Sequence, residues 1–293
     1  WLPASFKRAL YRSRALSGFI RRALNRAAPG GLAQVSVAAG GLQGAPLLLD
    51  LHAEKDYWLG TYEPELQQAV ADWLKEGMLI YDVGANIGYV SLLLARAAAE
   101  TGRVVAFEAL PANIQRLRAN LALNPSAQVT ALHAAVIDST RPVTFYTHAS
   151  GSMGKAAGSA GREDQAYAAS ITVDGLALDD YVYAQGNPAP QAVKMDIEGG
   201  EVLALQGMAR LLREARPVLL VELHGEQAAR AAWQALSAAG YTIHRMQKGY
   251  PQVASLDELD WKAYIVAGCR QSALVHHREL FHHRVVMNFL HPK

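Results

Sequence analysis

The stretch Leu79–Tyr89, "LIYDVGANIGY", decides the fold. A short, mostly apolar run ends in a turn with two glycines, and a stretch of helical period, Tyr89–Glu100, follows it. A buried strand that passes through a glycine turn into a helix is typical of a doubly wound parallel sheet. We therefore predict an α/β domain that begins near Leu79.

Short apolar runs and helical periods alternate along the rest of the chain, which predicts βαβ units. The seven strands expected in a mostly parallel sheet are Leu79–Val83, Arg103–Phe107, Val129–Ala135, Ala192–Met195, Val218–Glu222, Tyr241–Arg245 and Ala263–Ala267. An extra strand is expected at Pro142–Thr147. The helices expected to cover both faces of the sheet are Tyr89–Glu100, Ala112–Asn124, Glu201–Arg213 and Gln227–Ala239.

Two stretches break this alternation. Ser150–Ala169 is rich in Gly, Ala and Ser, which predicts a mobile loop, either a plain insertion or a substrate lid. His276–His291 holds five of the ten histidines, and we interpret it as a surface segment rather than a metal site.

The composition indicates a globular enzyme-sized chain. Of its 293 residues, 51% are hydrophobic and 18% are charged, and no apolar run is long enough to span a bilayer. Cys269 is the only cysteine, which excludes an intrachain disulfide and a thiolate metal cluster. We expect a cytoplasmic protein, peripheral to the membrane if its N-terminal arm binds lipid.

That arm is basic. Residues 1–49 contain seven Lys and Arg and no acid, so the remainder has 21 basic against 26 acidic residues. The apolar residues that share one helical face are Phe6, Leu10, Leu16, Ile20 and Leu24. The interpretations are a helix at residues 1–26 on an anionic membrane, or one docked on its own domain or on a second copy in a homo-oligomer. Nucleic acid is disfavoured because aromatics do not interleave with the arginines.

Three regions follow from these patterns. Residues 1–54 form a basic N-terminal extension, an amphipathic helix that ends at Ala28–Gly31 and then a linker. Residues 55–270 form the α/β domain, and residues 271–293 form a histidine-rich tail.

The glycine turn predicts a cofactor that is not a dinucleotide. Gly84 and Gly88 let backbone N–H groups approach a ligand closely, but the turn lacks the third glycine of a pyrophosphate cradle. Asp82 at the strand end suits a positively charged amino-acid moiety and would repel a pyrophosphate. Glu108, twenty residues after Gly88, can accept hydrogen bonds from both ribose hydroxyls, and Ala135 and Val136 can flank an adenine ring. Together they favour S-adenosylmethionine.

Several separate blocks resemble the FkbM-type methyltransferase family. They are "DVGANIGYVSLLLA", "VVAFEALPANIQRLRANLALN" and "VKMDIEGGEVLALQG", with "YWLGTYEPEL", "LALDDYV" and "PVLLVELH" around them. The resemblance covers about residues 55–270 and implies a Rossmann-like class I methyltransferase fold and O-methylation of a hydroxyl on a sugar, glycan or natural product. The residues expected at the cofactor are Asp82, Gly84, Ala85, Asn86, Gly88, Glu108 and Ala109, with Tyr62 and Glu63 closing over its methionine end. The departures are Leu110 before the proline and Gly200 where the family usually has alanine.

Methyl transfer to a hydroxyl needs a base or a metal to remove the proton. The candidates at the ends of two strands are Lys194, Asp196, Glu198, Glu222 and His224. In one mechanism His224 or Asp196 takes the proton, which we favour slightly. In the other, Asp196, Glu198, Glu222 and His224 hold Mg²⁺ or Mn²⁺. Glu198 and Glu201 also suit a simpler interpretation as acids at a helix N terminus, above all Glu201.

Three rival functions fit the sequence less well. A nicotinamide oxidoreductase lacks its third glycine and proton relay here. A nucleic-acid or other small-molecule methyltransferase is a second alternative, although "DIEG" stands where base-amine enzymes carry an Asn/Asp-Pro-Pro turn. A non-catalytic cofactor-binding module is the third.

Overall fold

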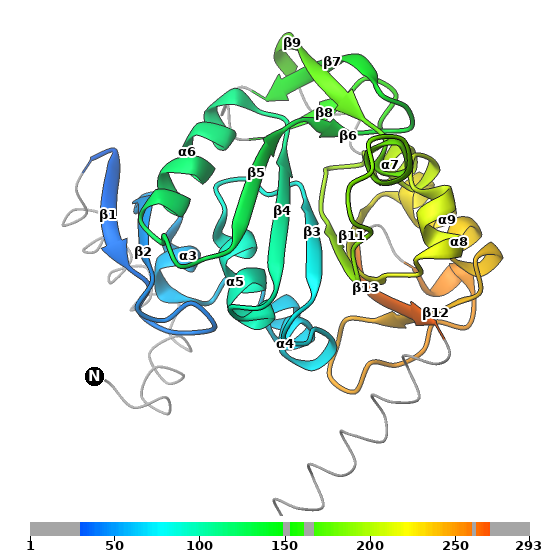
Figure 1. The fold of residues 1–293 in the computed structure, drawn as a ribbon, viewed down its shortest axis with the longest axis horizontal. Coiled ribbons are helices and arrows are strands. Elements are labelled where there is room, and N and C mark those ends of the chain that lie inside the picture. The colour runs from blue at the N-terminus through cyan, green and yellow to red at the C-terminus, as the bar shows by residue number, and fades with distance from the viewer. Residues whose placement is uncertain (1–29, 149–152, 161–166, 260–261, 270–293) are drawn as a thin grey trace, which may run out of the picture. The chain divides into compact units, whose positions relative to one another are not determined.

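The computed structural model describes residues 30–148, 153–160, 167–259 and 262–269 (Figure 1). The chain divides into two units, Trp1–Tyr62 and Glu63–Lys293. In the first unit, β1 (Leu32–Ser36) and β2 (Pro46–Asp50) form an antiparallel hairpin, followed by α3 (Lys55–Leu59). The stretch before residue 54 that was expected to be a linker therefore contains a hairpin.

The expected helix at residues 1–26 and the histidine-rich tail from residue 271 lie outside the described residues. Within the described part of the chain, no helix combines the length and the apolarity needed to cross a membrane.

The second unit contains the seven-stranded sheet that the sequence predicts (Figure 1). Its strands, given in spatial order, are β12 (Tyr241–Arg245), β13 (Lys262–Cys269), β11 (Val218–His224), β10 (Ala192–Met195), β3 (Leu79–Val83), β4 (Arg103–Glu108) and β5 (Val129–His133). Only β13 runs antiparallel to its neighbours within this sheet. The order reverses at β3 and β10, so the carboxyl ends of these two central strands meet at the point where doubly wound sheets bind ligands.

Helices cover both faces of the sheet because each strand carries apolar side chains on both sides. On one face, Ala106 of β4 packs against Ile114 and Leu117 of α6 (Pro111–Ala122). The other helices of this unit are α4 (Pro64–Trp73), α5 (Tyr89–Ala98), α7 (Glu201–Gln206), α8 (Ala209–Glu214), α9 (Glu226–Ala238), η1 (Asp180–Ala184) and η2 (Leu256–Glu258).

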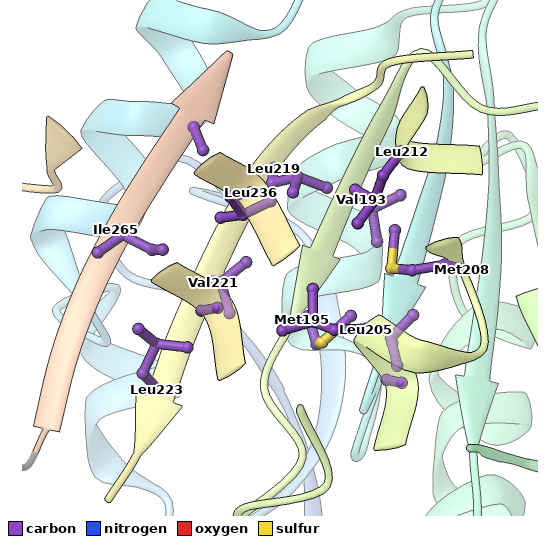
Figure 2. Packing of buried hydrophobic residues seen from close by; sticks show 14 of the residues in the cluster. Val193, Met195, Leu205, Met208, Leu212, Leu219, Val221, Leu223, Leu236 and Ile265 are labelled. Carbon is purple, nitrogen blue, oxygen red and sulfur yellow. The ribbon is translucent and has the colours of Figure 1, made fainter. Parts of the chain in front are cut away.

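The opposite face carries the larger core cluster, which Figure 2 shows from close by. Val193 and Met195 of β10 meet Leu205 and Met208 from the α7–α8 segment, and β11 extends the contact toward α9. These side chains are almost completely buried. This packing fixes the ends of β10 and β11, where the candidate catalytic residues lie.

Two expected elements are each divided in the structure. The strand predicted over Val129–Ala135 ends at His133, and Ala135–Val136 forms β6 in another sheet. The helix predicted over Glu201–Arg213 breaks at Gly207, where a Cβ atom would lie 2.0 Å from the carbonyl oxygen of Ile137. Both boundaries depend on a distant segment, so the local periodicity does not reveal them.

The second sheet corrects the interpretation of Ser150–Ala169 as a loop. Its spatial order is β6, β9 (Tyr167–Leu176), β7 (Arg141–His148) and β8 (Gly154–Ala156). β8 and the beginning of β9 come from the stretch expected to be mobile, and both pair with β7, which was expected as a strand. Gly, Ala and Ser have weak strand propensity, so only the pairing with β7 makes β8 a strand.

Candidate active site

One cleft lies at the carboxyl ends of the central strands. The expected cofactor residues in its wall are Gly84, Asn86, Glu108, Ala109, Ala135 and Val136. Asp196 and Glu198, expected in catalysis, line the same cleft. The fold therefore brings segments up to 114 residues apart in the sequence to one cavity.

The glycine turn after β3 has no room for side chains. Gly84 has a φ of +82°, and a Cβ atom there would lie 1.9 Å from the carbonyl oxygen of Asp196. Gly88 has a φ of +90°, and its Cβ would lie 2.5 Å from the Cδ1 atom of Leu117. Glycine is thus required at Gly84 for conformation and for space, and at Gly88 for its positive φ, because the end of the Leu117 side chain can move. The turn packs the end of β3 directly against the end of β10.

Glu108 ends β4 as a buried carboxylate on the cleft wall. Its two oxygens accept hydrogen bonds of 2.8 Å from the backbone N–H groups of Asn86 and Leu110. Burial raises the pKa of Glu108, and these hydrogen bonds oppose the rise. Because the Oε1 atom also accepts a 3.4 Å hydrogen bond from the side-chain amide of Asn113, the second lone pair of Oε2 is the acceptor that remains for a ligand hydroxyl.

Asp82 lies beneath the cleft rather than on its wall. It is fully buried, accepts a 2.6 Å hydrogen bond from the hydroxyl of Ser91, and lies 3.4 Å from the Nζ atom of Lys194. Lys194 also donates to the carbonyl oxygen of Gly84 at 3.1 Å. Burial alone would lower the pKa of Lys194, but the charges of Asp82 and Asp196 outweigh it and raise the pKa. The ammonium group therefore stays charged and ties the glycine turn to β10.

Four carboxylates surround His224 at the end of β11. The Nδ1 atom lies 3.0 Å from Glu201, and the Nε2 atom lies 3.1 Å from Glu222. Glu198 and Asp196 are 3.7 and 3.8 Å from the same Nε2 atom. The Nε2 edge of the imidazole therefore lies in a cluster of acidic side chains. Two members of this cluster, Asp196 and Glu198, line the cleft.

The charges in this cluster are strongly coupled. Burial alone would lower the pKa of His224, but the hydrogen bonds to Glu201 and Glu222 raise it to about 11. Burial raises the pKa of Asp196 to about 7 against the opposing charge of Lys194. Without a further cation, His224 is thus an imidazolium at neutral pH.

Two groups of side chains have ligand atoms close enough together to hold a metal ion. One consists of Asp196, Glu198 and His224, and the other of Glu63, Asp196 and Glu222. Within each group the ligand atoms lie within 4.8 Å of one another. Asp196 belongs to both, so the sequence-predicted cation ligands lie close together in the structure.

Backbone strain marks the same region. Glu63, Asn86 and Glu198 are non-glycine residues with φ values of 41°, 49° and 54°. Such conformations cost free energy and concentrate at functional sites, where the surrounding structure holds them.

Other expected cofactor residues lie outside the cleft wall. Ala85 is buried beneath it, and Gly88 begins α5. Tyr62 belongs to the first unit, where its ring lies 4.4 Å from that of Tyr57. Roles for these residues at the cofactor stay predictions.

The structure adds wall residues that the sequence reasoning missed. Asn113 donates to Glu108 at 3.4 Å, and β7 and the 153–160 segment supply much of the opposite wall. These wall residues are Phe145, Met153, Gly154, Ala156 and Ser159. The described part of the stretch expected as an insertion or lid therefore forms cleft wall.

The chain is similar to known methyltransferases over part of its length. Residues 82–243 match the family described as the Methyltransferase FkbM domain. The chain is 27% identical over 162 residues to the hexuronic acid methyltransferase AglP of Haloferax volcanii. The aligned segment covers 55% of this chain and 62% of that protein. The chain thus spans less than two thirds of that relative.

Solved structures of related shape include two methyltransferases. A methyltransferase FkbM from Methylobacillus flagellatus is 20% identical, with 74% of this chain and 53% of that chain covered and a TM-score of 0.42. An S-adenosylmethionine-dependent O-methyltransferase from Thermotoga maritima is 14% identical, with 81% of this chain and 77% of that chain covered and a TM-score of 0.43.

Proposed function

The chain belongs to the FkbM methyltransferase domain family and is an S-adenosylmethionine-dependent methyltransferase, and we propose that it methylates a hydroxyl oxygen of a carbohydrate acceptor. The observation that carries the proposal is the single cleft that joins Asn86 and Glu108 to Asp196 and Glu198. Asn86 and Glu108 suit the binding of a nucleoside, and Asp196 and Glu198 suit the activation of a neutral hydroxyl.

The cleft residues fit the cofactor. The backbone of the turn at Gly84 and Asn86 lines the cleft, and Glu108 is a buried acceptor on the same wall. Glu108 would bind the ribose hydroxyls, while Ala109, Ala135 and Val136 would flank the adenine. When bound, S-adenosylmethionine supplies an electrophilic methyl group on a sulfonium.

Charge favours a hydroxyl over a carboxylate as the acceptor. The carboxylates of Glu63, Asp196, Glu198 and Glu222 gather at one end of the site. An anionic acceptor would be repelled there, whereas a neutral hydroxyl can donate a hydrogen bond to any of these oxygens.

We infer that His224 is not the direct base in the cation-free protein. Both ring nitrogens contact carboxylates, and the raised pKa keeps the ring protonated. Direct proton removal would then be the task of Asp196, which lines the cleft and has a pKa raised toward neutrality by burial. A base poised near the working pH is effective in such a transfer.

We infer instead that Asp196, Glu198 and His224 hold a divalent cation. Two carboxylate oxygens and one imidazole nitrogen converge from the ends of β10 and β11, and the two carboxylates face the cleft. Oxygen-rich ligands suit Mg²⁺ or Mn²⁺, and a bound cation lowers the pKa of an acceptor hydroxyl. The excess negative charge around His224 would stabilise such an ion.

A sugar acceptor is supported by the relative AglP, whose name describes a hexuronic acid methyltransferase. Sugars offer hydroxyls that need activation of the kind this cleft can supply.

The test combines an acceptor panel with chelation. Purified protein, dialysed against EDTA, is incubated with methyl-labelled S-adenosylmethionine and neutral or uronic-acid glycans, with and without Mg²⁺ or Mn²⁺. We expect cation-dependent formation of an alkali-stable methyl ether. An alkali-labile ester would overturn the assignment of a hydroxyl as the acceptor. Full activity after chelation would overturn the cation site and leave Asp196 as the base.

A further inference from the structure

Glu201, at the start of α7, is a fully buried carboxylate beside the acidic cluster. Its place in the first turn of α7 gives it a favourable helix macrodipole, but a helix of only six residues stabilises a fully buried carboxylate little by itself. Burying a charge is costly unless it is paired. Glu201 must therefore be held in place by specific contacts.

One of its oxygens makes two contacts with the site. The Oε1 atom lies 3.0 Å from the Nδ1 atom of His224 and accepts a 3.2 Å hydrogen bond from the backbone N–H of Ile197. The Oε2 atom is buried without a hydrogen-bond partner among the described residues. All the hydrogen bonding found for this carboxylate is thus directed at His224 and at the loop between Asp196 and Glu198.

We propose that Glu201 is a positioning residue that fixes the ring orientation and tautomer of His224, and this inference rests on the proposed cation site. With Nδ1–H donated to Glu201, the Nε2 lone pair is directed toward Asp196 and Glu198. A carboxylate behind a ligating histidine is a common arrangement in metal sites, where it fixes the tautomer and increases ligand basicity.

The contact with Ile197 extends this role to the other two ligands. Ile197 lies between Asp196 and Glu198 in the chain, and Glu198 has the positive φ of a strained turn. The same carboxylate oxygen therefore holds the loop from β10 and the histidine from β11. Loss of the Glu201 side chain should disturb the ligands from both strands together.

Calorimetric titration of the EDTA-treated protein with Mn²⁺ alone tests this role. We expect Glu201→Ala to weaken Mn²⁺ binding by about 10–100-fold. Glu201→Gln keeps an oxygen that can accept from both N–H groups, so it should restore most of the affinity. The matched control is Glu226→Gln, an exposed acid at the start of α9, which should bind Mn²⁺ as the wild type does.

A second measurement separates positioning from folding. S-adenosylmethionine affinity should be unchanged in all variants, which also shows that they are folded. At a Mg²⁺ concentration that saturates the wild type, ¹⁵N shifts of the His224 ring should show a proton on Nδ1 alone in the wild type and in Glu201→Gln. In Glu201→Ala they should show in addition rings that carry the proton on Nε2 and do not bind the ion.

The outcomes distinguish this inference from its premise. Wild-type protein that binds neither Mn²⁺ nor Mg²⁺ would overturn the proposed cation site and this role with it. Tight wild-type binding that Glu201→Ala leaves unchanged would overturn the role of Glu201 alone.

Discussion

The proposed recognition of the cofactor rests on individual residues at the cleft, of which Glu108 gives the most direct test. Protonation of its carboxylate removes acceptor capacity for the ribose, and burial raises its pKa above the ordinary value of 4.5. We therefore expect S-adenosylmethionine affinity to fall as the pH is lowered, starting above the range of an ordinary glutamate. Calorimetry between pH 5 and 8 measures this change.

Glu108→Gln is the control for that profile. It should weaken binding by roughly tenfold, about the value of one hydrogen bond to a charged group, and flatten the pH dependence. Because the pKa of Glu108 is raised in the folded protein, its protonation stabilises the fold as the pH falls. Unfolding driven by this group therefore does not explain a loss of S-adenosylmethionine affinity at low pH. Equal affinity and an equal pH profile in the variant would contradict the assigned role.

At the scale of elements, the break between α7 and α8 lies where Gly207 packs against the backbone of Ile137. The Cβ atom of Gly207→Ala would lie 2.0 Å from the backbone oxygen of Ile137, and backbone cannot move aside as a flexible side chain can. We expect a loss of about 1–3 kcal/mol in the free energy of unfolding, measured in urea.

Gly30→Ala is the matched control, because its Cβ meets nothing within 4 Å. It should change the stability by less than about 0.5 kcal/mol. If both variants were equally stable, the break would not depend on the lack of space at Gly207.

At the scale of the whole molecule, the basic arm suggests a membrane-bound acceptor. It lies outside the described residues, so its role is argued from sequence alone. We expect the intact chain to float with vesicles that contain anionic lipid and not with neutral ones. Arg21→Gln combined with Arg22→Gln should remove about 2 kcal/mol of attraction, roughly a thirtyfold weaker partition. Failure to float with anionic vesicles would remove this proposal.

The sequence by itself determined the fold class and the glycine turn, because buried strands, helical periods and glycine positions are local signals. It also predicted that Asp196, Glu198, Glu222 and His224 would lie together, since the carboxyl ends of neighbouring parallel strands meet. The spacing of Glu201, Ala204 and Leu205 on one helical face could have indicated that Glu201 is buried.

Only the tertiary structure decided which partners these residues have. Asp82 pairs with Lys194 beneath the cleft instead of lining it, and β8 becomes cleft wall because it pairs with β7. The protonation of His224 depends on four carboxylates from two strand ends and a helix. These contacts join segments far apart in the chain. Charge coupling weakens with distance and strengthens with burial, and neither quantity can be read from the local sequence pattern.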